Sequence, residues 1–231
     1  SFNTPVHVVE IRRGPAITLF GVEPDYIESR NGKTRVRVSN IVHLADDLAM
    51  ALKASRIRIQ APVPGKGYVG IEVPNQKTEL VSLLEIVQSP SFATNPDPLK
   101  FALGKNVAGQ PFTASLADMP HLLIAGTTNS GKSVCVNAIL ASYLLTLTPD
   151  QIRFVLVDPK RVELTSYNGI PHLLAPVIVD AEKVVGALQW MLREMDLRYR
   201  MFAETGVRNL VEYYQLKAAE GGKILPFLLV V

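Results

Sequence analysis

Cysteine is nearly absent from this sequence of 231 residues, in which Cys135 is the single example. One cysteine cannot form a disulfide within the chain or a cysteine-based metal cluster. Cys135 stands between two valines, so we interpret it as a packing residue. The composition suits a reducing compartment, and we therefore expect the protein to be cytoplasmic.

Long apolar runs are also absent. None approaches the roughly 20 residues that a bilayer-spanning helix needs, although 48% of the residues are hydrophobic. The stretch after Ser1 lacks the charged and then apolar pattern of an export signal. We expect this segment to make no membrane contact itself, and its length allows a large core or two domains.

A strong net charge is missing as well, because 24 basic residues face 21 acidic ones and leave a formal charge of +3. That balance alone does not indicate a nucleic-acid partner. The basic residues of the first third gather in a cluster at Arg12, Arg13, Arg30, Lys33, Arg35, Arg37, Arg56, Arg58 and Lys66. This basic cluster could contact DNA phosphates or a neighbouring subunit, or could be a solvated surface, and few aromatic residues for base stacking lie nearby.

Residues 1–95 are expected to form a small α+β domain. Residues 6–11 and 16–22 have strand patterns around the turn signal Gly14-Pro15, and Asn31-Gly32 marks a second turn. The further expected elements are a strand at 34–38, a helix at 41–52 and strands at 57–60 and 68–73. Residues 89–98 are rich in proline and other turn formers, so we place the domain boundary there, between residues 95 and 96.

Residues 96–231 alternate strand and helix patterns, which predicts an α/β domain with a parallel sheet. The expected elements are a strand at 122–125, a helix at 133–145, a strand at 152–157 and a long helix at 181–204. The long helix carries apolar residues every three or four positions, as a helix that packs on a sheet does. Residues 227–231 look like the beginning of another buried strand.

The segment between the strand at 122–125 and the helix at 133–145 has the pattern of a phosphate-binding P-loop. Its residues are Gly126, Thr127, Thr128, Asn129, Ser130, Gly131, Lys132 and Ser133. Glycine lets the backbone curl so that its amides face phosphate oxygens, and the following helix presents its positive end. Lys132 is the expected catalytic residue because its mobile charge reaches the β- and γ-phosphates, while the Ser133 hydroxyl completes the coordination of Mg²⁺. The sequence therefore predicts ATP and Mg²⁺ as cofactors.

Asp158 directly follows the apolar strand at 152–157, where a doubly wound sheet places residues that meet ligands. It could assist at the nucleotide or signal to a neighbouring subunit, or, with Pro159, it could simply end the strand and open a turn. An ATPase of this kind also needs an acidic pair at the end of another apolar strand. The strand pattern at 227–231 reaches Val231 before any such residue, so we expect a truncated motor that is poorly active alone.

Several further polar residues have structural interpretations. In the helix at 181–204, Glu194–Arg198 and Asp196–Arg200 are spaced for i,i+4 ion pairs on a solvated face rather than for contacts with DNA. His172 has no second metal ligand at a suitable spacing. We interpret it as a structural residue.

Several blocks outside the P-loop resemble the motor domain of the FtsK/SpoIIIE family of double-stranded DNA translocases. They include Arg13-Gly14-Pro15, Pro64-Gly65-Lys66, the approach to the P-loop from Met119, Asp158-Pro159-Lys160 and Gly169-Ile170-Pro171-His172. The resemblance implies an α domain, here residues 1–95, and then a RecA-like P-loop NTPase domain, here residues 96–231, truncated before its acidic strand end. It also implies a hexameric ring of the complete motor around double-stranded DNA, and often a membrane anchor upstream.

Two residues depart from the family's pattern. Asn129 stands where glycine is common, and Tyr214 stands where asparagine is common. Asparagine adopts left-handed backbone conformations more readily than most residues, so we expect the loop to tolerate Asn129.

The leading hypothesis from the sequence is an ATP-driven motor that moves double-stranded DNA in chromosome segregation or cell division. A P-loop ATPase for conjugative transfer or protein export is one alternative, although the Arg13-Gly14-Pro15 block argues against export. A nucleotide-binding module that does not hydrolyse is another. DNA-stimulated ATP hydrolysis distinguishes a DNA motor from an ATPase of protein export and from a module that does not hydrolyse.

Overall fold

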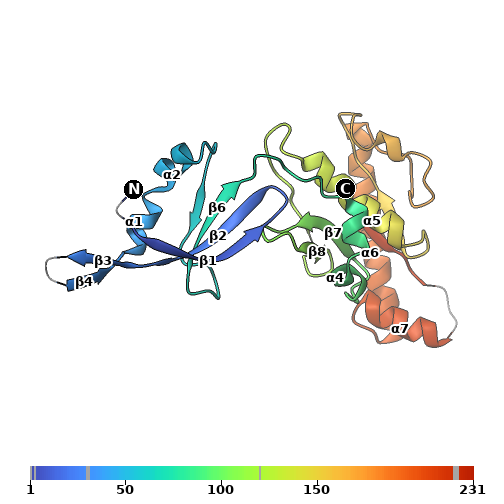
Figure 1. The fold of residues 1–231 in the computed structure, drawn as a ribbon. Helices are drawn as coiled ribbons and strands as arrows, with labels where there is room; N and C mark the ends of the chain where they lie inside the picture. Colours follow the sequence, from blue (N-terminus) through green and yellow to red (C-terminus); the bar gives the residue numbers. More distant parts are fainter. Residues whose placement is uncertain (1, 3, 30–31, 120, 221–223) are drawn as a thin grey trace. The chain divides into compact units, whose positions relative to one another are not determined.

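The computed structural model describes residues 2, 4–29, 32–119, 121–220 and 224–231. The chain divides into two compact units, Ser1–Ile124 and Ala125–Val231, whose elements are drawn in Figure 1. The first unit is built mainly from antiparallel strands and short helices, and the second from longer helices and parallel strands.

A four-stranded antiparallel sheet forms the first part of the first unit, in the order β1-β2-β6-β5. Its strands are β1 (Val6–Arg13), β2 (Ile17–Pro24), β5 (Arg58–Gln60) and β6 (Val69–Pro74). The amide of Gly14 closes the turn between β1 and β2 by donating to the carbonyl of Ile17 (2.8 Å). The four strands predicted in this region and the turn at Gly14-Pro15 are therefore confirmed, with small differences at the strand ends.

Two short helices follow β4, α1 (Val38–Val42) and α2 (Ala45–Ala51) (Figure 1), and α1 packs against this sheet through Ile41. The buried residues of this core are Val22, Val36, Ile41 and Val69. The single helix predicted at 41–52 is wrong, because the chain leaves helical geometry between α1 and α2. The first turn of α2 holds Asp46 and Asp47, and acidic residues stabilise a helix N-terminus, which favours a new start there.

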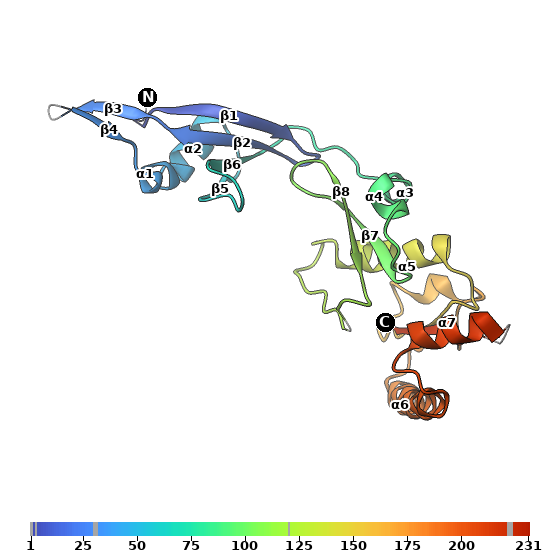
Figure 2. The same ribbon diagram turned by 90° about the horizontal axis from the view of Figure 1, so that it is seen from below.

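A two-stranded ribbon extends from the sheet of the first unit (Figure 2). Its strands, β3 (Tyr26–Ser29) and β4 (Gly32–Arg35), pair antiparallel. Of the turn predicted at Asn31-Gly32, Asn31 lies outside the described residues, and Gly32 begins β4 opposite Ser29. The strand predicted at 34–38 is correct only at its start, because helix α1 already begins at Val38.

The second part of the first unit was not predicted from the sequence. It packs two short helices, α3 (Leu83–Val87) and α4 (Pro90–Ala93), on a hairpin of β7 (Lys100–Lys105) and β8 (Pro111–Ser115). Its buried core consists of Ile86, Phe92 and Ala102. Ser89 caps α4, because its hydroxyl accepts a hydrogen bond from the amide of Phe92 (3.4 Å). The turn formers at 89–98 therefore include a capped helix that contributes to a core.

The turn at Gly14 packs closely against the turn between β7 and β8 within the first unit. A Cβ atom on Gly14 would lie 2.5 Å from the carbonyl oxygen of Val107, so only glycine fits there. Asn75 holds the same turn in place, because its side-chain amide donates to the carbonyl of Gly14 (2.8 Å). The Arg13-Gly14-Pro15 block thus serves as a packed joint between the two parts of this unit.

The second unit contains a pair of parallel strands, as the alternating sequence pattern predicted. β9 (Ile152–Val155) pairs with β10 (Phe227–Val230), and single parallel bridges to Leu173 and Ile178 add a third segment. The helical elements are α5 (Lys132–Thr146), a 3₁₀ turn η1 (Thr165–Tyr167), α6 (Ala181–Thr205) and α7 (Leu210–Glu220). The helices predicted at 133–145 and 181–204 and the strand expected at 227–231 are confirmed. In the part of the chain that the structure describes, no helix is long and apolar enough to span a membrane.

The strand predicted at 122–125 is not formed. These residues have an irregular backbone that pairs with none of the described strands, and Leu123 is 90% exposed. A strand becomes stable when its amides and carbonyls join a ladder. An apolar run without a pairing partner therefore does not become a strand.

Helix α6 ends at Gly206, whose left-handed backbone (φ 71°) terminates the helix without strain. Its Arg198 donates to Glu194 (2.8 Å) and to the carbonyl of Pro226 just before β10 (2.7 Å). The two charged side chains are 13% and 21% exposed, so the solvated face predicted for this pair is wrong. Among the described residues, Asp196 and Arg200 form no ion pair.

Candidate nucleotide-binding site

The predicted P-loop is a curled segment that runs directly into helix α5. Two of its residues have left-handed backbones, Asn129 with φ 62° and Gly131 with φ 93°. The amide of Ser130 donates back to the carbonyl of Thr127 (3.2 Å), which tightens the curl. Asn129 therefore adopts the conformation that we expected asparagine to tolerate at this position.

Gly126 opens the loop at a position with no room for a side chain. A Cβ atom there would lie 2.4 Å from Oγ of Ser130 and 3.2 Å from its Cβ. The first residue of the loop thus packs directly against its fifth, and the glycine keeps the backbone close enough for this contact.

Helix α5 begins with Lys132 and presents its free amides to the loop. The first amide that donates within the helix is that of Cys135, to the carbonyl of Gly131 (2.9 Å). The amides of Lys132, Ser133 and Val134 therefore have no partner within the helix, as at every helix N-terminus. Together with the helix dipole, they form a positive end that suits a phosphate group.

Lys132 folds its side chain back over the loop. Its ammonium donates to the carbonyls of Gly126 (2.8 Å) and Thr127 (2.6 Å). These two bonds hold a positive charge at the mouth of the curl. An anion that enters the loop therefore meets the ammonium group at once and competes with two carbonyl oxygens for it.

Ser133, in the first turn of α5, offers the hydroxyl that was predicted to bind Mg²⁺. A hydroxyl oxygen is the kind of hard ligand that Mg²⁺ accepts, usually together with nucleotide phosphates and water. Among the described residues, no group of three or more His, Cys, Asp or Glu side chains could hold a metal ion. A role of the Ser133 hydroxyl as a ligand of Mg²⁺ stays a prediction.

Asp158 holds the loop that follows β9. The side chain is buried, at 5% exposed, and its Oδ2 accepts hydrogen bonds from the amides of Glu163 and Leu164, both at 2.9 Å. The hydrogen bond from the Leu164 amide, and then that from Glu163, lowers the pKa of the Asp158 carboxyl below its ordinary value of 3.8. These contacts give Asp158 a definite structural role, and a role at the nucleotide stays a prediction.

A contact that the sequence did not suggest ties this loop to the helix of the P-loop. The hydroxyl of Tyr167 in η1 donates to Oδ1 of Asn137 in α5 (2.9 Å), and burial raises the pKa of that hydroxyl. The two residues lie 30 positions apart, and no spacing rule connects them. The loop from Asp158 to Tyr167 is consequently held by hydrogen bonds within the loop and by one hydrogen bond to α5.

His172 has the structural role that we expected. Its Nε2 lies 2.9 Å from the carbonyl of Leu147, which caps the C-terminal end of α5, and its ring stacks on Phe154 of β9. His172 thereby links the end of the P-loop helix to the central strand. Its backbone carbonyl also accepts from the amide of Phe154 (2.8 Å).

The carboxyl ends of the two parallel strands lie at one edge. The carbonyl of Val231 accepts from the amide of Val157 (2.7 Å), and the amide of Val231 donates to the carbonyl of Val155 (3.0 Å). Val231 is therefore in register with the residues that precede Asp158. In open α/β sheets this edge is where ligands bind.

A curled glycine loop that leads into a helix N-terminus, beside a parallel α/β sheet, defines a P-loop nucleotide-binding protein with a RecA-like domain. Family models agree with this class. The model described as FtsK/SpoIIIE family matches residues 82–231, and the model described as FtsK alpha domain matches residues 1–75. The chain belongs to the FtsK/SpoIIIE family.

Curated relatives match across the whole chain. DNA translocase SftA of Bacillus subtilis is 44% identical over 232 residues, which are 100% of this chain and 24% of that protein. DNA translocase SpoIIIE of the same organism is 46% identical over 238 residues, 100% of this chain and 29% of that protein. DNA translocase FtsK of Clostridium tetani is 45% identical, over 100% of this chain and 30% of that protein. The chain thus spans less than a third of the length of these relatives.

A solved structure shares the fold. It is the conjugation coupling protein TcpA of pCW3, in a monomer form with ATPγS. The likeness has a TM-score of 0.52 at 19% identity and covers 97% of this chain and 57% of that chain. It supports the fold class predicted from the sequence, a RecA-like P-loop domain preceded by a smaller domain.

Proposed function

We propose that this protein is an ATP-driven translocase of double-stranded DNA that acts in chromosome segregation and cell division. The observation that carries the proposal is a well-formed P-loop in a chain whose two family models, at 1–75 and 82–231, cover nearly all of it. The relatives that match both parts are named DNA translocases.

The P-loop assigns the nucleotide chemistry. ATP enters with Mg²⁺, and residues 126–133 hold its phosphates through backbone amides. The Lys132 ammonium then leaves the carbonyls of Gly126 and Thr127 and binds the β- and γ-phosphates instead. Ser133 supplies a hydroxyl ligand to the Mg²⁺ ion. We expect the acidic pair that an ATPase of this kind needs to lie at the same sheet edge as Asp158.

Assembly and organisation complete the proposal. The motor forms a hexameric ring around duplex DNA, with residues 1–95 as the α domain and 96–231 in the RecA-like domain. It works in the cytoplasm, and an upstream segment of the longer protein can anchor it in the membrane. Limited proteolysis tests the boundary: a domain end at residue 95 gives a stable fragment that begins near residue 96. A stable fragment that begins before α3 would contradict this boundary, because it keeps Ile86 and Phe92 together with Ala102 in one core.

The alternatives have less support. The conjugation coupling protein shares the fold at an identity too low to transfer its role. The two matched family models and the named DNA translocases give no support for protein export. A module that binds nucleotide without hydrolysing it predicts no ATP hydrolysis with or without duplex DNA.

DNA-dependent ATP hydrolysis by the full-length protein tests the function. We expect duplex DNA to stimulate hydrolysis, and we expect Lys132→Ala to abolish it because the phosphates lose their mobile charge. Lys77→Ala removes an exposed lysine of the first unit and should leave the rate unchanged. Equal rates with and without DNA, together with no salt-sensitive affinity for duplex DNA, would refute the proposal.

A further inference from the structure

The β3–β4 ribbon carries one strongly basic face. Along an extended chain successive side chains point to opposite faces. Val36 is buried in the core of the first unit, so its neighbours Arg35 and Arg37 lie on the other face, and so does Lys33. The backbone of Arg37 is still extended (φ −76°, ψ 138°), which continues the alternation to the start of α1.

The partner strand adds a tyrosine and a glutamate to this face. Tyr26 lies opposite Arg35, and Glu28 lies opposite Lys33. Residues directly opposite each other share a face of the ribbon. Among the described residues, the face therefore carries three positive charges and one negative charge, beside an aromatic ring that is 57% exposed.

Ion pairing divides the basic cluster into two groups. Arg12 pairs with Glu10, and Arg58 lies 3.9 Å from Glu72. By contrast, no described acidic side chain pairs with Lys33, Arg35 or Arg37, all of which are exposed. Arg56 and Lys66 of the cluster also form no ion pair among the described residues, but only the ribbon brings three such side chains to one face.

The base of the ribbon is held firmly while its faces remain open. The amide of Val36 donates to the carbonyl of Asp25 (2.9 Å), which extends the ladder beyond β4. A two-stranded ribbon exposed on both faces gains little stability from its own contacts.

We propose that this ribbon face contacts the phosphate backbone of duplex DNA through Lys33, Arg35 and Arg37. The inference rests on the proposed function and assigns one DNA-contacting surface to the first unit. Alternate side chains on a strand repeat about every 6.6 Å, close to the rise of two nucleotides at about 3.4 Å each. A two-stranded ribbon also has dimensions that the major groove admits.

Charge favours DNA over a second copy of the chain as the occupant. Protein interfaces have cores that are depleted in lysine and rich in apolar area. On this face Tyr26 is the only large ring, and the remaining side chains are charged. A polyanion such as DNA can neutralise the charges of Lys33, Arg35 and Arg37, and it needs no apolar interface core to do so. The negative charge of Glu28 on the same face weakens this attraction.

The test measures duplex DNA binding by the full-length protein as a function of salt. For B-DNA the slope of log K against log salt is about −0.9 per neutralised phosphate. Lys33→Ala, Arg35→Ala and Arg37→Ala together should therefore reduce the slope by about 2.7. Between about 50 and 200 mM salt, the affinity of the wild type should fall about 40-fold more than that of the triple variant.

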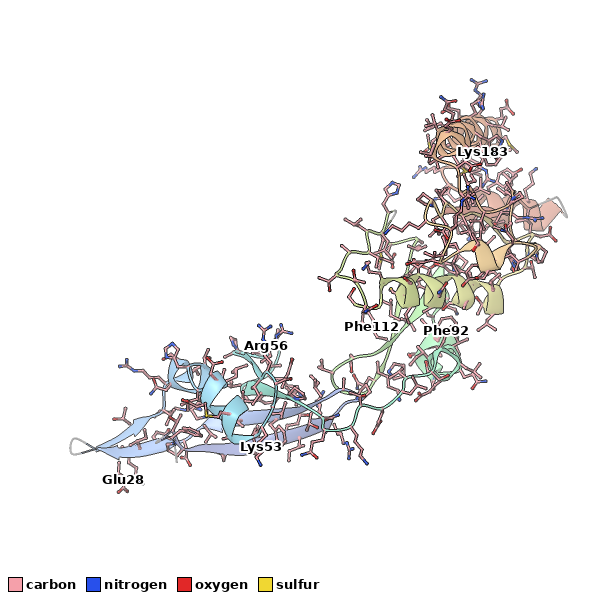
Figure 3. All side chains as sticks on the ribbon, turned by 90° about the horizontal axis from the view of Figure 1, so that it is seen from above. Glu28, Lys53, Arg56, Phe92, Phe112 and Lys183 are labelled. Carbon is pink, nitrogen blue, oxygen red and sulfur yellow. The ribbon has the colours of Figure 1, made fainter. Side chains whose placement is uncertain are left out.

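A matched variant removes three charges away from the ribbon. Lys53→Asn, Arg56→Ala and Lys77→Ala change exposed residues of the first unit, and asparagine suits the left-handed backbone of Lys53 (φ 51°). Figure 3 shows Glu28 on the ribbon and Lys53 and Arg56 away from it. The matched variant should keep the wild-type slope.

Glu28→Gln supplies the opposite change on the ribbon itself. Removing the one acidic side chain of the face should raise DNA affinity at low salt, and the gain should vanish at high salt because the interaction is screened. Thermal melts of all variants establish that each one is folded.

The outcomes separate this inference from the proposed function. A wild-type protein without salt-sensitive DNA binding overturns both. A salt slope that the triple ribbon variant leaves unchanged overturns the ribbon contact alone, provided that the wild type binds DNA. Loss of self-association in sedimentation, with an unchanged DNA slope, would identify the ribbon as a contact between copies and would also overturn the inference.

Discussion

Replacing Asn129 by valine or by glycine tests whether the left-handed curl of the P-loop is needed for nucleotide binding. Asn129 has φ 62°. This region costs a residue with a Cβ atom about 1–2 kcal/mol, less for asparagine and most for β-branched residues. We expect Asn129→Val to weaken nucleotide binding by about 1–2 kcal/mol, or roughly 5-fold to 30-fold in Kd, because the loop is strained or uncurls. Asn129→Gly should bind as well as the wild type or better.

Calorimetric titration of the chain with Mg·ADP measures these affinities without interference from hydrolysis. Thr128→Val is the matched control, because it introduces the same side chain at a neighbouring residue without a left-handed backbone. We expect it to bind nearly as the wild type does. Wild-type affinity in folded Asn129→Val would refute the need for the curl. Equal losses in the two valine variants would show that the side chain, and not φ, decides binding.

Two predictions concern the joint and the loop that frame the site. Gly14→Ala places a Cβ atom 2.5 Å from the carbonyl of Val107, so we expect a loss of about 1–3 kcal/mol in stability by thermal melting. Gly67→Ala is the control, because no atom lies within 4 Å of the Cβ atom that it adds, and it should have the Tm of the wild type. Equal Tm values for the wild type and both variants would contradict the packed joint at Gly14. Asp158→Asn should lower Tm at neutral pH, because a neutral amide oxygen accepts hydrogen bonds more weakly than a carboxylate. Because the pKa of Asp158 is lowered in the folded state, the stability that its carboxylate adds is fully present above pH 3.8 and is lost as the pH falls further. The difference in Tm between the wild type and Asp158→Asn should therefore narrow below pH 3.8, and a constant difference would contradict the role of the carboxylate.

Long periodic segments were predictable from the sequence for a physical reason. The apolar residues of α6 repeat over many turns, and Gly206 supplies a stop signal that acts locally. The P-loop is likewise one continuous stretch, whose glycines, lysine and serine act on the backbone immediately around them. Each of these signals depends on neighbours in the sequence, so no knowledge of the tertiary structure was needed.

Short elements and unpaired strands were not predictable in this way. Helices α3 and α4 are too short to show a period, and the turn formers at 89–98 hid the cap that Ser89 provides. The strand expected at 122–125 has the right composition, yet a strand also needs a partner. Partners for a ladder come from distant parts of the chain, which a local pattern does not contain.

The supports of the site were hidden from the sequence because they join distant residues. Asp158 was expected at the edge of the sheet, but the sequence did not reveal that its carboxylate binds the amides of Glu163 and Leu164. Backbone amides have no signature in a sequence. The hydrogen bond between Tyr167 and Asn137 could not be predicted either, because nothing in the sequence around each residue indicates the other as its partner.

These hidden contacts connect the P-loop helix to the ligand edge of the sheet. α5 is bonded to the loop after β9 through Asn137 and Tyr167, and its C-terminal end is bonded to His172 beside β9. Asp158 closes that same loop upon itself. We expect a displacement of α5 to be transmitted to the edge at Asp158 through these bonds. The hydrogen-bonded loop thus connects the helix that follows the P-loop to the sheet edge at Asp158.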